Sequence, residues 1–532
     1  MRQVFRKIPV YTGDVSGVCS ALFELGGMVV MHDPSGCNST YNTHDEIRWY
    51  DHDSLIFLSG LNDTDAMLGN DEKLIRDITE AARIYSPSFI AIANSPIPYI
   101  VGMDFDAITR IIEKETGIPS FYISTNGMHD YTRGAGLAFL QIAKRFAGVP
   151  VDLEKEKGKK VYKEKAENDH KEKSGKDCKE KVEKDFSKEE NRAGRKKIRV
   201  NLLGMTPLDF SAPSTEQSLR KKLASAGIEI VSNWAMDQDM VSDGRDSSSS
   251  ISPISTDRNL TEDRTEAEEL VHAPKGGAES SADTPENGFS GHSNDNRYNQ
   301  LLSDICRSAS ADVNLLLSST GLPAAEYMKE RFGIPFVAGI PACGTEELYF
   351  EAVRTAAETG ENQFPFRERK AAAADGPDEK KLPVCLIGEP VVMTSLAASM
   401  QTLTGVPTHV FGMTEEGRGE PAGSSLFLGG NDFAPAGEEE LNARLRNITG
   451  QSEGDASVLH AAESEIGVIA DPCYEDAIPQ GYTIIRLPHL AFSGRIFLRE
   501  IPDLMDESVV SRLQSFLSGR DRDNGEKNPA RN

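Results

Sequence analysis

The chain alternates between short apolar runs and longer segments in which apolar residues recur at helical spacing. A short apolar run bounded by polar residues is typical of a parallel strand covered on both faces. In the first part of the chain, such runs predict strands at 28–31, 54–58, 89–93 and 120–124. Helical spacing predicts a short helix that begins within 20–25, a second helix that ends at Tyr85, and two more over 105–116 and 135–146. Residues 1–15 are expected to form an irregular arm. Strands and helices in this order predict βαβ units and one α/β domain over residues 1–150.

The same pattern returns twice. In a second domain, residues 198–360, strands are predicted at 198–204, 228–232, 313–317 and 335–338, with helices over 215–226, 299–308 and 323–332. In a third, residues 382–518, strands are predicted at 384–388, 409–411, 466–470 and 483–487, with helices over 391–403 and 507–517 and polar loops at 412–423 and 434–462. The expected fold class is therefore α/β, with three Rossmann-like parallel-sheet domains.

Polar segments interrupt this pattern. Residues 151–197 mix Lys and Glu with few apolar residues, and residues 241–298 are rich in Ser, Asp and Gly. Such segments bury too little apolar surface to offset the entropy of ordering, so we expect a charged insertion and a disordered insertion. Residues 361–381 are expected to be a linker, and 519–532 a charged tail.

The composition and charge of the chain argue against several classes of function. The net charge of −25 disfavours nucleic-acid binding, which needs a basic face. The N-terminus has no apolar signal segment, and no apolar run reaches the length of a membrane span. Seven widely spread cysteines do not form a secreted disulfide pattern, so a reducing cytoplasm is expected. The chain carries neither a G-x-G-x-x-G fingerprint nor a P-loop, so it is not expected to hydrolyse ATP itself.

The candidate chemistry lies in residues 17–41, where Cys19 and Cys37 flank an apolar run. Cysteine thiolates are metal ligands, and Gly-rich loops let backbone N–H groups approach cluster sulfurs. Free cysteine is also among the most buried residue types. The spacing is longer than that of a C-x-x-C pair, so both interpretations, cluster ligands or core residues, stay open on the residues alone.

Five stretches together resemble nitrogenase component 1, which comprises the molybdenum–iron protein α and β chains, assembly scaffolds and nitrogenase-like reductases. They are HDPSGC at 32–37, LNDTDAMLGNDEKL at 61–74, SPIPYIVGMD at 95–104, VNLLG at 200–204 and EYMKERFGIP at 326–335. The resemblance covers nearly the whole chain outside the insertions.

The resemblance implies three α/β domains and an oligomer with a homologous subunit, either a second copy or a paralogue. It implies an iron–sulfur cluster between two first domains, with electrons supplied by an ATP-hydrolysing iron protein. Cys19 and Cys37 match the first two cluster cysteines of the family, whereas Ser95 stands where the third is expected. Two cysteines per chain suffice for a [4Fe-4S] cluster shared across a two-fold or pseudo-two-fold interface.

A second departure concerns the active-site cofactor. The family's cofactor-ligating cysteine falls in the region 315–321 of this chain, which contains none, and Cys343 does not match that position. His489 is the one candidate for the histidine partner of that cofactor. The expected function is an oxidoreductase subunit that relays electrons to a substrate other than dinitrogen, with any second metallocofactor unassigned. A non-catalytic scaffold or carrier for metallocluster assembly, and an α/β binding protein without a cluster, are the alternatives.

Overall fold

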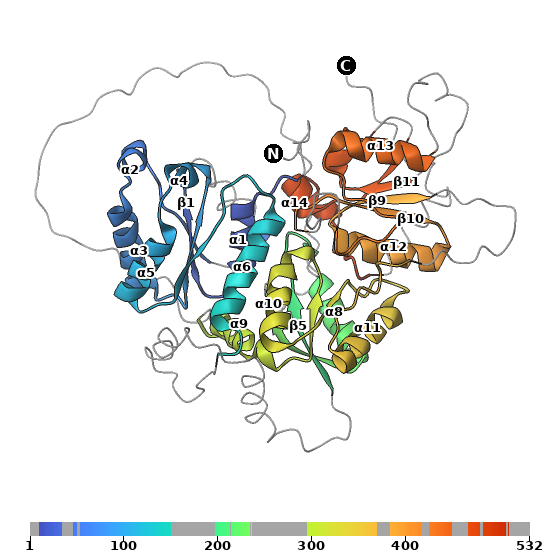
Figure 1. Cartoon of the computed structure of the whole chain (residues 1–532), viewed down its shortest axis with the longest axis horizontal. Coiled ribbons are helices and arrows are strands. Elements are labelled where there is room, and N and C mark those ends of the chain that lie inside the picture. Colours follow the sequence, from blue (N-terminus) through green and yellow to red (C-terminus); the bar gives the residue numbers. More distant parts are fainter. Residues whose placement is uncertain are drawn as a thin grey trace, which may run out of the picture.

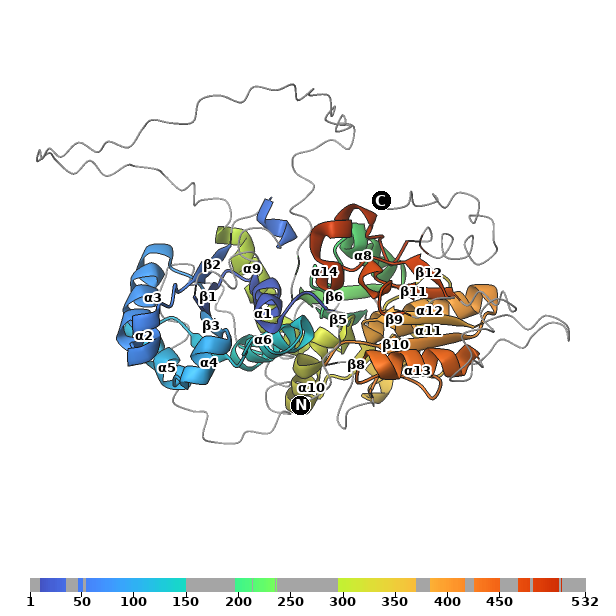
Figure 2. The ribbon, with the colours of Figure 1, turned by 90° about the horizontal axis from the view of Figure 1, so that it is seen from above.

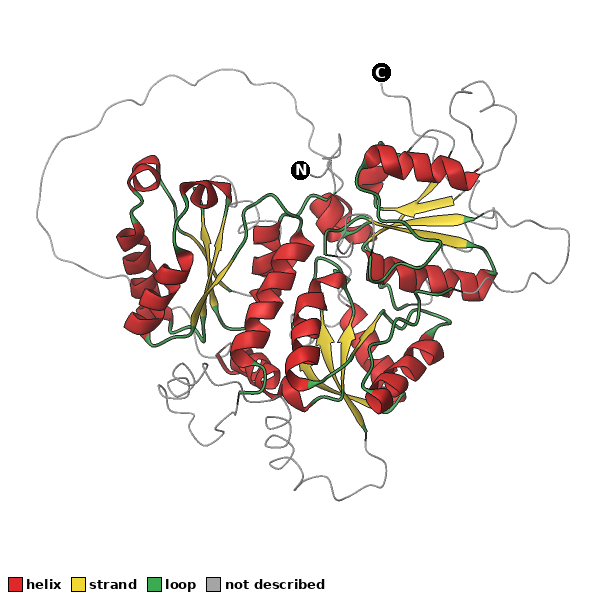
Figure 3. Ribbon diagram, in the orientation of Figure 1, coloured by secondary structure: helices red, strands yellow, loops and turns green. Residues whose placement is uncertain are grey.

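The computed structural model describes residues 10–34, 46–50, 54–149, 197–212, 214–234, 236, 295–369, 383–416, 425–449, 467–478, 482–506 and 509. These residues form three parallel four-stranded sheets, each flanked by helices, as the sequence predicts (Figures 1 and 3). No helix in the described part of the chain is long and apolar enough to cross a bilayer.

The first domain contains strands β1 (Met28–His32), β2 (Leu55–Leu58), β3 (Ile90–Asn94) and β4 (Ser120–Ile123). Its helices are α1 (Asp14–Leu22), α2 (Asp63–Leu68), α3 (Asp71–Tyr85), α4 (Pro96–Val101), α5 (Phe105–Thr116) and α6 (Tyr131–Phe146), with a 3-10 turn η2 (Ile47–Tyr50). The strands match the prediction closely. The first helix begins at Asp14, within the expected arm and six residues before the predicted start, because tertiary packing against α6 stabilises a Gly-containing segment of weak helical propensity.

The second domain contains strands β5 (Ile198–Leu203), β6 (Ile228–Asn233), β7 (Val313–Leu316) and β8 (Phe336–Ala338). Its helices are α8 (Ser214–Ser225), α9 (Asp295–Arg307), α10 (Leu322–Phe332) and α11 (Glu346–Thr359), with 3-10 turns η4 (Ser308–Ser310) and η5 (Ser319–Gly321). Within the segment expected to be a linker, Phe366 is buried in the core of this domain. Apart from Lys197 and the first turn of α9, the expected insertions 151–197 and 241–298 lie outside the described residues.

The third domain contains strands β9 (Val384–Gly388), β10 (Thr408–Gly412), β11 (Gly467–Ala470) and β12 (Thr483–Arg486). Its helices are α12 (Pro390–Thr404), α13 (Glu438–Thr449) and α14 (Leu490–Ser493), with 3-10 helices η7 (Pro472–Tyr474) and η8 (Gly494–Glu500). The predicted loop 434–462 was wrong at α13, whose buried face has only Leu441 and Leu445 as fully buried apolar residues. The predicted helix 507–517 lies outside the described residues except for Val509.

All three sheets have the same strand order. It is β2-β1-β3-β4 in the first domain, β6-β5-β7-β8 in the second and β10-β9-β11-β12 in the third, with every pairing parallel. In each sheet, the second strand in sequence pairs with one side of the first strand, and the third strand in sequence pairs with the other side of the first. Parallel sheets bind ligands at the carboxyl ends of the strands at such a switch point, which lies between β1 and β3, β5 and β7, and β9 and β11.

Helices α1 and α6 lie between the first sheet and the other two domains (Figures 1 and 2). They pack backbone to backbone, because Gly17 lies against the Tyr131 carbonyl group and Gly134 lies against the Asp14 carbonyl group. A Cβ atom at either glycine would overlap the facing backbone. This close contact fixes α1, and with it Cys19, relative to the rest of the molecule.

We expect Gly134→Ala to destabilise the protein by about 2 kcal/mol in urea unfolding, because overpacking costs roughly 1–3 kcal/mol. Helix propensity alone predicts the opposite sign, since alanine is favoured over glycine in a helix by about 1 kcal/mol. Gly430→Ala is the matched control, because a Cβ there meets open space. Unchanged or increased stability in Gly134→Ala would contradict the close packing.

Candidate functional site

Cys19 lies on α1 and is fully buried in the core cluster that joins α1, the first sheet and α6. Burial raises the pKa of its thiol well above the usual value, and the nearby Glu46 carboxylate raises it further. Arg48 holds Glu46 beside α1, since its guanidinium contacts Glu46 at 2.8 Å and Glu24 at 3.0 Å. Cys19 is thus a neutral thiol in this chain alone, and a metal must displace its proton to bind.

Ser95 lies at the carboxyl end of β3 and precedes α4 as its N-cap residue. A serine at this position usually accepts a hydrogen bond from the first turn of the helix. Here the side chain makes no capping bond, and the buried Oγ atom has no hydrogen-bond partner in the part of the chain that the structure describes. Position 95 therefore has a serine hydroxyl where the family resemblance predicts a cysteine thiolate.

Asp33 directly follows β1 and is completely buried. Its backbone is held on both sides, because its N–H donates to Ser59 Oγ at 3.2 Å and its carbonyl oxygen accepts from the Leu61 N–H at 3.0 Å. Among the described residues, neither carboxyl oxygen has a hydrogen-bond partner. Sequence reasoning missed this residue, although an acid at the end of a mostly apolar strand was a signal that could have found it.

Asp33 and Ser95 lie on the face of the first sheet that carries Cys19. Strands β1 and β3 pair in register, with His32 opposite Asn94, so the next residues, Asp33 and Ser95, are neighbours across the two strand ends. The side chains of His32 and Asn94 turn to the other face, where they contact Met103 and Tyr122. Alternation therefore directs the following two residues to the α1 side.

The third predicted site residue, Cys37, lies outside the described residues. Among the residues that the structure describes, no three His, Cys, Asp or Glu side chains converge on one metal position. The described part of the site thus supplies one buried thiol and two buried oxygen-bearing groups. Thiolate is the usual ligand of iron–sulfur clusters, and carboxylate suits harder metal ions.

A second buried polar cluster lies where the three domains meet. Asp209, in the loop after β5, accepts hydrogen bonds from Tyr131 Oη at 2.5 Å and Ser318 Oγ at 2.6 Å. His489 Nε2 faces the same carboxylate at 3.3 Å, while its Nδ1 accepts from the Ala491 N–H. One carboxylate therefore joins residues of the first, second and third domains. Of these, sequence analysis named only His489, and in the structure it pairs with an aspartate.

The same junction contains Glu389 and Asp471, which directly follow the central strands β9 and β11. Glu389 accepts from the Ser319 N–H at 3.0 Å and the Val392 N–H at 2.7 Å. Burial, followed by repulsion from Asp209, raises the pKa of Glu389 to about 7. Asp471 accepts from the N–H groups of Cys473 and His489. An acid directly after each apolar strand would have been the sequence signal for both residues.

The remaining described cysteines do not extend the first-domain site. Cys306 and Cys385 are buried core residues, and burial raises the pKa of the Cys385 thiol to about 12. Cys343 and Cys473 are half-buried, and burial together with Asp471 raises the pKa of the Cys473 thiol. No disulfide forms among these residues.

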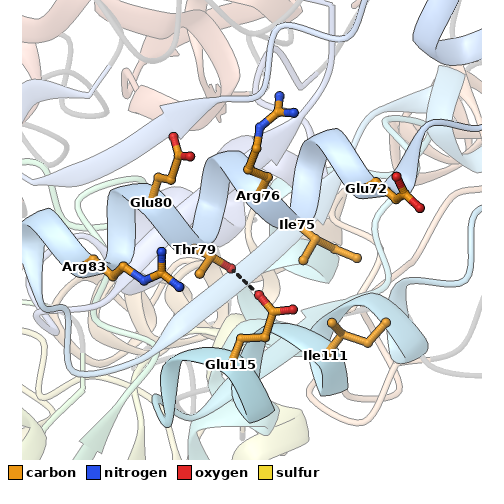
Figure 4. Close-up of a pocket in the computed structure, with 8 residues that line it drawn as sticks. All are labelled: Glu72, Ile75, Arg76, Thr79, Glu80, Arg83, Ile111 and Glu115. Atoms are coloured by element: carbon orange, nitrogen blue, oxygen red, sulfur yellow. Dashed lines mark hydrogen bonds between the residues drawn. The ribbon is translucent and has the colours of Figure 1, made fainter.

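A shallow pocket lies on the outer helices of the first domain rather than at these sites. Figure 4 shows side chains of α3 and α5 around it, with Thr79 hydrogen-bonded to Glu115 at 3.4 Å. Its rim combines Arg76 and Arg83 with glutamates. Neither Cys19 nor Ser95 lines it.

A comparison with protein families matches residues 16–412 to the model described as "Nitrogenase component 1 type Oxidoreductase". The chain belongs to this family. The match contains the three predicted site residues, Cys19, Cys37 and Ser95, and most of the three-domain junction. The family resemblance drawn from the sequence is confirmed.

Two solved structures are similar to this nitrogenase component 1 type chain, "Nitrogenase Cp1 at pH 5" and "Nitrogenase Cp1 at pH 6.5". Each has a TM-score of 0.49 and 12% sequence identity. The first comparison covers 98% of this chain and 90% of the other, and the second covers 99% and 92%. No curated protein sequence matches the chain. The family is one of oxidoreductases that bind iron–sulfur-type clusters, form oligomers and work with an iron protein.

Proposed function

We propose that this chain is a cytoplasmic oxidoreductase subunit that holds a [4Fe-4S] cluster through Cys19 and Cys37, with Ser95 beside it. The cluster is shared with a homologous subunit and receives electrons from an ATP-hydrolysing iron protein. The observation that carries the proposal is the pair of buried, unpartnered side chains at the switch point of the first sheet, on the face that also carries Cys19. Buried polar groups are normally hydrogen-bonded, so their lack of partners marks a place for a ligand.

An exposed apolar patch supports placing a second subunit at this end of the first domain. Helices α2 and α4 contact each other, and α4 starts directly after Ser95 (Figure 1). The patch on these helices consists of Met67, Leu68, Ile97, Tyr99, Ile100 and Val101. Met67, Leu68 and Ile100 are each more than 70% exposed, which is typical of a protein-contacting surface when such residues are contiguous. A subunit that covers this patch would lie next to the cluster residues.

This chain's own residues have distinct roles in the proposed site. Cys19 supplies a thiolate from a rigid helix that is held against α6. The Ser95 hydroxyl, at the end of β3, either donates a hydrogen bond to the cluster or binds iron through its oxygen. The core around Cys19 excludes water. When bound, an iron–sulfur cluster takes up and releases single electrons. The region 315–321 offers serines and a threonine, not a thiolate, at the three-domain junction. We therefore propose a substrate other than dinitrogen.

Anaerobic purification with iron and sulfide analysis, together with electron paramagnetic resonance after dithionite reduction, tests the cluster. We expect Cys19→Ala to lose most of the iron and the reduced-cluster signal. Cys306→Ala is the matched control, because Cys306 is also a buried cysteine on a helix and should keep both. A colourless, iron-free wild-type protein would support the α/β binding protein without a cluster. Equal iron in the two variants would remove Cys19 from the site.

A cluster-assembly scaffold or carrier is the second candidate, and the Ser95 oxygen favours it. A protonated hydroxyl is a weaker iron ligand than a thiolate, so a cluster held partly by oxygen is more readily released. Transfer of the cluster to an apo-protein acceptor, without turnover driven by the iron protein, would identify a carrier. Turnover of a reducible substrate in the presence of the iron protein and ATP would identify the enzyme.

A further inference from the structure

The Asp33 side chain is an unusual feature for a folded core. It is fully buried. Within the described residues, neither of its carboxyl oxygens has a hydrogen-bond partner, and no Lys or Arg pairs with it. Burial of a carboxyl group without a partner costs several kcal/mol, and such groups persist where a ligand or function requires them.

The Asp33 backbone is held in place by hydrogen bonds on both sides. Ser59 and Leu61 fix its N–H and carbonyl groups. The neighbouring His32 ring is also fixed, because its nitrogens contact Ser59 Oγ at 2.7 Å and Met103 Sδ at 3.2 Å. The end of β1 is therefore held in place, and alternation along the strand puts the Asp33 side chain on the α1 side of the sheet.

Another strand-end acid, in the third domain, shows what a purely structural acid looks like. Asp471 directly follows β11, a central strand like β1, and it is as deeply buried as Asp33. It accepts hydrogen bonds from the Cys473 and His489 N–H groups and from Ser493 Oγ. The contrast between this fully partnered carboxylate and the unpartnered carboxyl group of Asp33, both at the ends of central strands, is what a ligand at Asp33 would explain.

We infer that the Asp33 carboxylate is an oxygen ligand to an iron of the cluster, beside Ser95. This inference rests on the proposed function. Iron accepts carboxylate oxygen as well as thiolate sulfur, and a negative oxygen ligand stabilises the more oxidised cluster. Asp33 would thus supply the negative charge that Ser95, in place of a cysteine, does not supply.

The test compares Asp33→Asn with Asp471→Asn in anaerobically purified, 57Fe-enriched full-length protein. Asp33→Asn should weaken iron binding by at least the roughly tenfold that loss of an outer-shell partner causes. It should also abolish the Mössbauer subsite of the oxygen-ligated iron and raise the reduction potential of any remaining cluster. In the iron-free protein, Asp33→Asn should leave the urea midpoint unchanged or higher, whereas Asp471→Asn should lower it.

The outcomes separate the two proposals. Iron-free wild-type protein overturns both. A wild-type cluster with unchanged iron content, Mössbauer spectrum and potential in Asp33→Asn overturns the ligand role of Asp33 alone. A lowered urea midpoint of iron-free Asp33→Asn, equal to that of Asp471→Asn, identifies a structural carboxylate and also overturns it. Asp33→Cys supplies a further check, because a thiolate should restore iron binding with a spectrum lacking the oxygen-ligated subsite.

Discussion

We expect Asp209→Ala to lower the free energy of unfolding by roughly 3–5 kcal/mol, the cost typical of removing one partner from a buried ionic network. Asp209 accepts from Tyr131 Oη and Ser318 Oγ and faces His489 Nε2. Its removal leaves the buried hydroxyls of Tyr131 and Ser318 without their acceptor and takes away the carboxylate that faces His489 Nε2. Urea unfolding followed by circular dichroism measures the loss.

Single deletions around Asp209 provide the controls. Tyr131→Phe and Ser318→Ala each remove one hydrogen bond to the carboxylate and should cost about 1 kcal/mol apiece. Their effects should largely disappear in the Asp209→Ala background, because the acceptor is already absent. If Asp209→Ala costs no more than either single deletion, the carboxylate does not connect the three domains energetically.

The strands were predictable because each is a short apolar run that is buried on both faces. A reader of the sequence can recognise such strands from their own residues alone, as in Val384–Gly388 and Ile90–Asn94. Helix α4 was missed because it holds two prolines, although both fall in the first turn, where no backbone N–H is needed. Helix α13 was missed because its sequence is polar apart from a narrow apolar face.

The candidate site was predictable only as far as its residues lie in a recognisable motif. Cys19 and Ser95 were identified in this way, but Asp33, four residues before Cys37, was not. Its significance depends on its burial and on the absence of partners, neither of which a sequence displays. Asp209 is an extreme case, because its partners Ser318 and His489 lie more than 100 residues away in the chain. Only the meeting of three strand-end loops brings them together.

The second large effect is a loss of stability with rising pH that depends on Glu389. Its pKa is about 7 in the folded protein, compared with 4.5 for an unperturbed glutamate. Below pH 4.5 both states hold the proton, and the folded protein is not penalised. Between pH 4.5 and 7 the unfolded chain releases the proton while the folded protein keeps it, so stability falls. The fall amounts to about 3 kcal/mol and is complete above pH 7.

Glu389→Gln should remove this fall, so the stability difference between pH 5 and pH 8 should be about 2.5 kcal/mol smaller in the variant than in the wild type, since the rest of the fall lies below pH 5. The variant loses one acceptor for a backbone N–H, but that cost is independent of pH and cancels in the comparison. Asp130, whose pKa burial raises to about 6, gives a fall in the same direction that should remain. Parallel stability–pH curves for the two proteins would contradict the prediction.

Asp209→Asn connects the two predictions. Repulsion from Asp209 is the second cause of the raised pKa of Glu389, after burial. Removal of that charge should let folded Glu389 ionise at lower pH. The fall in stability should still begin near pH 4.5, where the unfolded chain releases its proton, but it should end at lower pH and become smaller. The asparagine oxygen can still accept one of the hydrogen bonds, so Asp209→Asn should destabilise the junction less than alanine does. If the fall ends at the same pH in Asp209→Asn as in the wild type, the two carboxylates do not interact, and burial alone sets the pKa of Glu389.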